Sequence, residues 1–409
     1  MKSVRPESAA IAAAMKSSIS RRRVLQAAGI GGAAVAVAAC GAGGGSAAST
    51  GGTSGAPTAA AAEDLSDTDK VANWSNWPLY IDIDDTTGSR PTLDAFQKET
   101  GITVAYTEDV NDNNEFFAKV RTQLEQGRDI GRDIVVLTDW MAGLWIASGF
   151  AQKLNKELIP NSSNLLPRWQ GVQFVPNRDY SLPWQAGFGA LGWNKALLKE
   201  ATGTDTMTSI DQLFDPALKG RITVLSEMRD TMGILMAYQG ADPSKFTEDQ
   251  YNKAIELLTS QVDNGQIRQV MGNDYAAALE SGDVIAVIGW SGDMFQLGED
   301  FGVGLPETGG TLWTDNMLIP ALAQHKKNGE LLMNYYYDPE VAAQVAAYVQ
   351  YISPVKGAKE AMEAIDPALV DNPWIFPSEE MFNNSYVFMS LTPAENEKYD
   401  RAFQKAIGG

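Results

Sequence analysis

Cysteine and histidine are almost absent from this 409-residue chain, in which Cys40 is the only cysteine and His325 the only histidine. With no second cysteine, the chain forms no intramolecular disulfide. A zinc site of the usual His/Cys kind is nearly excluded, and Ser-His-Asp or Cys-His catalysis depends on His325 alone, in a segment whose polar composition predicts a loop. This scarcity of catalytic groups favours binding over catalysis.

Other catalytic and cofactor motifs are also missing. The chain has no Gly-Lys-Ser/Thr phosphate-binding loop. We expect no cofactor and no metal. Carboxylate-only chemistry, as in glycosidases, stays open because acidic residues are plentiful.

Long hydrophobic runs are lacking too, since no run of 18 apolar residues follows Cys40. The apolar run 27–39 has 13 residues, which is short of the ~20 that a spanning helix needs. It lies between the twin arginines of 20–25 (SRRRVL) and the small-residue tetrad 37–40 (VAAC). This order is typical of a Tat-type lipoprotein signal peptide, residues 1–39, with Cys40 lipidated. We therefore expect an exported protein, either in the periplasm or anchored by lipid to the outer face of the cytoplasmic membrane.

Basic residues are outnumbered by acidic ones, 32 to 51, which gives a net charge of −19. Removal of residues 1–39 takes away six basic residues and Glu7, leaving 26 basic and 50 acidic side chains and a net charge of −24. Nucleic acid and anionic lipid are poor partners for such a surface, whereas cations are good ones. The simpler explanation of the negative charge is that it keeps an exported protein soluble. The net charge alone therefore does not identify a ligand or partner.

The organisation of the chain follows from composition. Residues 40–69 hold the lipidated cysteine and a Gly/Ala/Ser/Thr-rich stretch, which predicts a flexible linker. The remaining 340 residues are enough for two domains. We place lobe 1 at 70–183 with 317–375 and lobe 2 at 184–316 with 376–409, with 180–184 as an extended crossing segment.

Short β-branched strands alternate with amphipathic helices beyond the linker. Strands are predicted at 71–73, 102–106, 134–137, 222–225 and 284–288, and helices at 91–100, 114–126 and from 139 onward. Continuous apolar strands between helices predict an α/β fold with mainly parallel sheets covered on both faces.

Aromatic rings and carboxylates recur where these strands end. Ligands of open α/β sheets bind at the carboxyl ends of strands. The residues found there are Trp74, Trp77, Tyr80, Thr138, Asp139, Trp140, Glu227, Asp230, Trp290, Asp293, Trp313 and Asp315. Carboxylates hold desolvated ammonium groups, and Trp rings pack on methylenes and attract cations. Each residue also has a structural explanation, and Asp139 and Asp230, taken singly, are better explained as helix N-caps.

Eight short segments, in order along the chain, resemble the spermidine/putrescine-binding proteins of ABC importers: 75–80 (SNWPLY), 133–139 (DIVVLTD), 182–184 (LPW), 192–195 (GWNK), 214–221 (FDPALKGR), 290–293 (WSGD), 313–315 (WTD) and 351–354 (YISP). The resemblance implies a two-lobed, type II periplasmic-binding-protein fold, with a polyamine, putrescine or spermidine, in the cleft between lobes. It also implies hinge closure around the ligand and an ABC permease in the membrane as partner. We expect a monomer.

The resemblance also assigns roles to residues. It places Trp77 and Tyr80 on the lobe 1 wall, Asp315 on an amine, and Asp293 in the Trp-x-Gly-Asp form of putrescine-type members. The remaining candidate ligand-binding residues are Asp139, Trp140, Glu227, Asp230, Trp290, Trp313 and Tyr351. The chain departs from the family at Pro78 and Leu79, which replace a polar pair, at Asp139, an extra acid, and after Phe376, where no binding residue can be matched.

Three other functional hypotheses stay open at this point. The first is a binding protein for another organic cation or a neutral solute. The second is a secreted carboxylate-only hydrolase with Glu227 and Asp230, or Asp293 and Asp315, as its acid pair, and the third is a purely structural surface lipoprotein, which predicts no ligand in the cleft.

Overall fold

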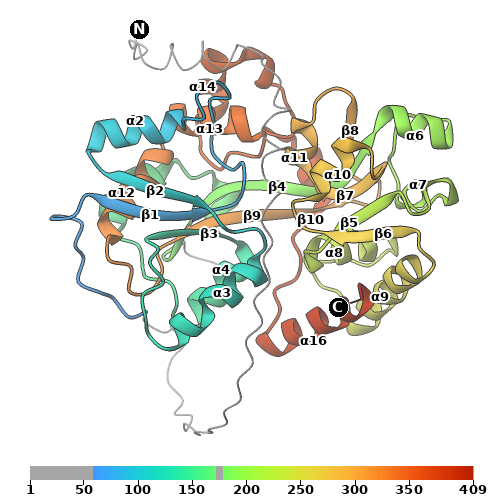
Figure 1. Ribbon diagram of the computed structural model, residues 1–409, viewed down its shortest axis with the longest axis horizontal. Coiled ribbons are helices and arrows are strands. Elements are labelled where there is room, and N and C mark those ends of the chain that lie inside the picture. Colours follow the sequence, from blue (N-terminus) through green and yellow to red (C-terminus); the bar gives the residue numbers. More distant parts are fainter. Residues whose placement is uncertain (1–58, 172–177, 409) are drawn as a thin grey trace, which may run out of the picture.

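The structure is a computed structural model that describes residues 59–171 and 178–408 (Figure 1). The predicted signal peptide, its twin arginines and Cys40 lie outside the described residues. Within the described residues, no helix is both long and apolar enough to cross a membrane.

One mixed sheet forms the centre of the molecule, in the order β2-β1-β3-β9-β4-β7-β5-β6, with β10 beside β9 and β8 beside β4. Its strands are β1 (Val71–Asn76), β2 (Thr103–Glu108), β3 (Ile134–Thr138), β4 (Ser181–Asn194), β5 (Ile222–Leu225), β6 (Ile267–Met271), β7 (Ala286–Trp290), β8 (Phe301–Gly304), β9 (Gly310–Leu318) and β10 (Ser385–Tyr386).

The strand directions divide the sheet into two parallel groups joined by antiparallel strands. β1 runs parallel to β2 and β3, and β5 runs parallel to β6 and β7. The two long strands β4 and β9 are antiparallel to each other and to β7 and β3 respectively. The parallel arrangement predicted from the sequence therefore holds within each group, and the chain crosses between the groups on β4 and β9 (Figure 1).

Helices cover the sheet on both faces (Figure 1). They are α2 (Pro91–Thr100), α3 (Asn113–Glu125), α4 (Asp139–Ala147), α5 (Pro167–Gln170), α6 (Lys195–Thr202), α7 (Ile210–Leu213), α8 (Met228–Tyr238), α9 (Glu248–Asp263), α10 (Tyr275–Ser281), α11 (Ser291–Gln296), α12 (Lys326–Tyr336), α13 (Pro339–Val349), α14 (Ala358–Ile365), α15 (Glu379–Asn383) and α16 (Pro393–Ala406).

Helix α2 shows how local sequence sets these boundaries. Pro91 fits the first turn because its missing N–H is not needed there. Leu93 and Phe96 are buried on one face. Gly101, at a φ of +72°, ends the helix and donates its N–H to the carbonyl of Gln97. The predicted boundaries of this helix are confirmed.

Two clusters of buried side chains lie under the two strand groups. One is built on β1, β2 and β3 with α12, α13 and α14, and the other on β5 and β7 with α8, α9 and α16. Strand β4 contributes to both, because Phe188 belongs to the first cluster and Ala190 to the second. The extended crossing segment predicted at 180–184 is thus the start of a longer strand.

The N-terminal side of β1 is attached to the first cluster. The backbone N–H of Lys327 donates to Asp64 Oδ2 at 3.1 Å, and the N–H of Asn328 donates to Ser66 Oγ, also at 3.1 Å. These are free N–H groups at the start of α12, so residues 64–66 cap that helix from outside it. The Leu322 N–H also donates to the Ala60 carbonyl at 2.9 Å, so the predicted linker contacts the folded body from Ala60 onward.

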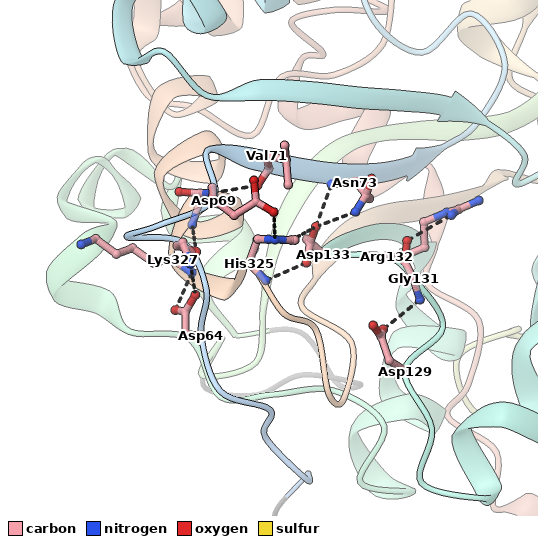
Figure 2. A network of polar contacts seen from close by, with 12 residues as sticks. Asp64, Asp69, Val71, Asn73, Asp129, Gly131, Arg132, Asp133, His325 and Lys327 are labelled. Carbon is pink, nitrogen blue, oxygen red and sulfur yellow. Dashed lines mark hydrogen bonds and ion pairs between the residues drawn. The ribbon is translucent and has the colours of Figure 1, made fainter.

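His325 lies inside this attachment, as Figure 2 shows. The residue is 7% exposed and is the N-cap of α12, so the predicted loop holds at His325 but not beyond it, because the helix starts at Lys326. Its Nδ1 lies 3.1 Å from Asp133 Oδ2 and its Nε2 lies 3.2 Å from Asp69 Oδ2. Asp133 also accepts hydrogen bonds from the backbone N–H groups of Asn73 and His325. This histidine joins the N-terminal segment to the start of β3.

Candidate ligand-binding site

A pocket of about 450 Å³ lies where strands and helices of the two core clusters meet. Its lining residues come from the loop after β1, the ends of β3 and β7, the starts of α3, α8 and α11, the turn before α10, β9, and the segment after α13. They are Trp77, Pro78, Tyr80, Asn113, Thr138, Glu227, Asp230, Asn273, Trp290, Asp293, Trp313, Asp315 and Tyr351. This position agrees with the rule that ligands of open α/β sheets bind beyond the carboxyl ends of strands.

The structure brings together nine of the eleven candidate residues in this pocket. The other two, Asp139 and Trp140, line an adjoining cavity of about 390 Å³. The two cavities share Thr138, Glu227, Asp230 and Trp313. Trp74, also found near a predicted strand end, is instead a fully buried core residue within β1, because that strand continues to Asn76.

Asp315 lies at the centre of the first-cluster side of the pocket. The residue is 5% exposed and lies in the middle of β9. Its Oδ2 accepts a hydrogen bond from the Tyr80 hydroxyl at 2.9 Å, and its Oδ1 accepts one from the Thr138 hydroxyl at 2.7 Å. Burial raises the pKa of Asp315 to about 7, against the lowering effect of these two hydrogen bonds.

Asp293 has a similar setting at the start of α11. Its Oδ1 accepts a hydrogen bond from the Tyr351 hydroxyl at 2.6 Å, and its Oδ2 accepts one from the Tyr275 hydroxyl at 3.0 Å. Burial raises the pKa of this carboxyl to about 6. Both carboxylates are thus held in place by neutral hydroxyl groups, and no cationic side chain of the described residues is bonded to either.

Asp230 is held by an indole and a hydroxyl. Trp290 Nε1 donates to its Oδ2 at 2.8 Å, and the Thr311 hydroxyl donates to its Oδ1 at 2.5 Å. Burial raises the pKa of Asp230. The residue is the third of α8 and not its N-cap, because Glu227 occupies that position and accepts a hydrogen bond from the backbone N–H of Arg229.

Among the four acidic residues that line the pocket, Glu227 has a cationic partner in an ion pair. Its Oε1 lies 3.6 Å from a guanidinium nitrogen of Arg229, and both side chains are 11% exposed. Burial nevertheless raises the pKa of Glu227 to about 7, and the nearby carboxylate of Asp112 adds to that effect. The Arg229 guanidinium lies 3.8 Å from the centre of the Trp140 ring and donates to Asn396 of α16. Trp140 therefore packs on a protein cation in the adjoining cavity.

Asp139 is occupied by protein groups. Its Oδ1 accepts a hydrogen bond from Asn316 Nδ2 at 2.6 Å and lies 3.7 Å from the buried guanidinium of Arg178. The N-cap explanation does not describe this geometry, because the N-cap of α4 is Thr138 and Asp139 forms a buried ion pair.

Aromatic rings form the walls between the carboxylates. Trp77 meets Trp290 edge-on with ring centroids 6.3 Å apart, and Tyr351 meets Tyr80 at 5.5 Å and Trp313 at 5.2 Å. Trp77 and Tyr80 are 8% and 4% exposed, so they are core residues and pocket residues at once.

Two glycines allow this close packing of rings. A Cβ on Gly292 would lie 2.6 Å from Tyr351 Cζ, and a Cβ on Gly187 would lie 2.5 Å from Trp313 Cζ2. Real Cβ atoms do not approach other atoms so closely. The glycine of the Trp-x-Gly-Asp motif is therefore required by the Tyr351 ring.

Four residues of the pocket were not among the eleven candidate ligand-binding residues: Pro78, Asn113, Thr138 and Asn273. The sequence had placed Thr138 at the end of a predicted strand without making it a candidate. Val387 and Phe388 line the adjoining cavity, and these are residues of the segment after Phe376 that could not be matched by motif. Asn273 gave no sequence signal, because it lies in a turn between β6 and α10.

The electrostatic balance of the pocket is strongly one-sided. Four carboxyl groups line it and, among the described residues, no lysine, arginine or histidine does. Burial raises the pKa of all four carboxyl groups, and the nearby Arg229 only partly offsets this effect at Glu227 and Asp230. Within the described part of the chain, no group of three or more His, Cys, Asp or Glu side chains is arranged to hold a metal ion. Such a pocket suits an organic cation with apolar segments.

The fold and the site together define a class: an α/β ligand-binding protein with two core clusters and an acidic, aromatic pocket between them. The family described as bacterial extracellular solute-binding protein matches residues 92–376, and the chain belongs to this family.

Relatives and solved structures extend this assignment. The chain is 27% identical over 352 residues to the spermidine/putrescine-binding periplasmic protein of Escherichia coli K12, covering 84% of this chain and 93% of that protein. It is 27% identical over 357 residues to the putrescine-binding periplasmic protein SpuD of Pseudomonas aeruginosa UCBPP-PA14, covering 83% and 92%. The solved structure of the spermidine/putrescine substrate-binding protein PotD from Streptococcus pneumoniae matches with a TM-score of 0.67 at 22% identity, covering 82% and 98%. The predicted type II periplasmic-binding-protein fold is confirmed.

Proposed function

We propose that this protein is the solute-binding component of an ABC importer and that it captures a polyamine, putrescine or spermidine. It is a binding protein and not an enzyme. The observation that carries the proposal is the set of four buried carboxyl groups, Glu227, Asp230, Asp293 and Asp315, which line one aromatic pocket that contains no cationic side chain.

A polyamine matches both the carboxyl groups and the aromatic rings of this pocket. The ammonium ends form charge-assisted hydrogen bonds with carboxylates. The methylene segments between them pack on the Trp290 and Trp313 rings, which also attract cations over their faces. The named ligands of the relatives, putrescine and spermidine, agree with this chemistry.

Capture by hinge closure is supported by the arrangement of the two core clusters. We propose that residues 70–183 with 317–375 move as lobe 1 and residues 184–316 with 376–409 as lobe 2. The pocket takes side chains from both, so a ligand that contacts both stabilises the closed form by its higher affinity for that form. The permease in the membrane then recognises the closed form.

Export and anchoring complete the proposal. The mature, monomeric protein begins at Cys40, whose lipid holds it at the outer face of the cytoplasmic membrane or in the periplasm. A twin-arginine signal, residues 1–39, directs it there. Within the described residues, the linker contacts the folded body from Ala60 onward, because the Leu322 N–H donates to the Ala60 carbonyl at 2.9 Å and residues from Asp64 onward bond to α12.

Isothermal titration calorimetry of the purified, lipid-free protein tests the proposed ligand. Putrescine, spermidine and agmatine are titrated in parallel with 1,4-butanediol, which has the chain length of putrescine but no charge. We expect saturable one-to-one binding of at least one polyamine and none of the diol. Equal binding of diol and diamine would point to a neutral solute, and the absence of polyamine binding would refute the proposal.

A further inference from the structure

Asn273 differs from the other polar residues of the pocket, because its side-chain oxygen has no partner. Within the described residues, Asn273 Oδ1 is buried and accepts no hydrogen bond. Asn113, the other asparagine of the pocket, uses both ends of its amide: Nδ2 donates to Thr138 Oγ1 at 2.9 Å, and Oδ1 accepts from the Thr138 N–H at 3.1 Å. Of the two asparagines that line the pocket, Asn273 is therefore the one with an unsatisfied amide oxygen.

The backbone around Asn273 is fixed, so its place in the pocket is well defined. The residue lies in the turn between β6 and α10, which closes with a hydrogen bond from the Tyr275 N–H to the Gly272 carbonyl at 3.2 Å. The Tyr275 hydroxyl in turn accepts from the Trp290 N–H at 2.7 Å and donates to Asp293. The turn that carries Asn273 is thereby tied to the pocket wall formed by Trp290 and Asp293.

A second buried polar atom of the pocket, Trp313 Nε1, also lacks a partner. The two differ in kind, since an indole N–H only donates and an amide oxygen only accepts. An ammonium group offers donors alone, so of these two atoms only Asn273 Oδ1 can bond to it.

We infer that Asn273 is a ligand-contacting, specificity-determining residue whose Oδ1 accepts a hydrogen bond from an N–H of the bound polyamine. This inference rests on the proposed function. A neutral acceptor adds a hydrogen bond without adding a fifth negative charge to the four carboxyl groups already present. The hydrogen bond also requires an N–H, so the residue favours primary and secondary ammonium groups over quaternary ones.

The test compares three variants with the unmodified protein, using calorimetric titration with putrescine and spermidine at pH 7.5. Asn273→Leu removes the acceptor at similar size, and Asn273→Asp keeps an acceptor. Asn252→Leu on the exposed face of α9 is the matched control. We expect Asn273→Leu to bind about ten- to a hundredfold more weakly, Asn273→Asp to stay within a few-fold of the unmodified protein, and Asn252→Leu to be unchanged.

The melting temperature without ligand separates ligand contact from a structural role. Removal of an unsatisfied buried acceptor costs the folded state nothing, so Asn273→Leu should melt at the same temperature as the unmodified protein or higher. Equal polyamine affinity of Asn273→Leu and the unmodified protein overturns the inference and leaves the proposed function standing. Lower affinity together with a lower melting temperature also overturns it, because Asn273 is then structural. Absence of polyamine binding by the unmodified protein overturns the proposed function and the inference together.

Discussion

Asp315→Asn should stabilise the ligand-free protein while it destroys polyamine binding. The carboxyl group is 5% exposed, and burial raises its pKa from 3.8 to about 7. A folded-state pKa above the unfolded value means that ionisation of this group opposes folding. The neutral amide of asparagine has nearly the same shape and carries no charge to desolvate.

The magnitude follows from the pKa shift. The rise of the pKa from 3.8 to about 7 corresponds to roughly 4 kcal/mol at a pH above 7, where the carboxyl group is ionised in both states. One of the two hydroxyl donors, Tyr80 or Thr138, must turn to accept from the new NH₂ group, which costs about 1 kcal/mol. A net gain of about 1–3 kcal/mol remains. The gain shrinks as the pH falls through 7 toward 4, because Asp315 is then protonated in the folded state.

Thermal melting without ligand and calorimetric titration with putrescine measure the two effects on the same sample. At pH 8 we expect the melting temperature to rise by a few degrees, and the affinity to fall by about 2–5 kcal/mol because an ammonium loses its desolvated partner. Asp94→Asn, on the exposed face of α2, is the control and should change neither quantity. A lower melting temperature with unchanged affinity would show that Asp315 is a structural residue and that the reasoning is wrong.

Three further predictions concern the aromatic wall, the N-terminal attachment and the anchor. Trp313→Ala should weaken putrescine binding by about 1–3 kcal/mol in the same titration, because methylene packing and cation attraction are both lost; unchanged affinity would place the ring outside the ligand site. Asp133→Asn should lower the free energy of unfolding by about 1–3 kcal/mol in a urea titration, since the two oxygens of Asp133 accept from the N–H groups of Asn73 and His325 and asparagine keeps only one of these acceptors, at the end of β3 opposite the pocket; any loss of putrescine affinity in this variant would contradict that separation. Cys40→Ser should give a folded protein that fractionates with the soluble material, and retention in washed membranes would reveal a second attachment.

The sequence was informative where a strand end and a pocket wall coincide. Trp77, Glu227 and Trp290 could be predicted because each lies next to the carboxyl end of a strand, and strand ends were recognisable from short β-branched runs. Trp313 and Asp315 were also in the predicted set, but they lie inside β9 and not after it. They reach the pocket because β9 passes antiparallel through the centre of the sheet, a direction that the local sequence does not encode.

Long-range pairing accounts for what could not be predicted. Asp139 is held by Arg178 and Asn316, which are distant in the sequence and meet it only in the folded chain. Asn273 has no motif, and its role depends on a turn that is fixed by Tyr275. The attachment of residues 64–66 to α12 was equally hidden, since their composition is that of a linker. Composition describes the free chain, whereas these contacts depend on which surfaces the fold brings together.

The release of protons when putrescine binds tests the central claim most directly. Asp293, Asp315 and Glu227 have pKa values raised to about 6, 7 and 7, so at pH 6.5 a substantial fraction of them is protonated. A bound ammonium favours the ionised carboxylates, and its own pKa, near 10, keeps it charged. Calorimetry at pH 6.5 in buffers of different ionisation enthalpy should therefore show net proton release, with affinity that rises from pH 5.5 to pH 8. Putrescine binding with no proton release and no pH dependence would contradict the claim that these buried carboxyl groups hold the ligand.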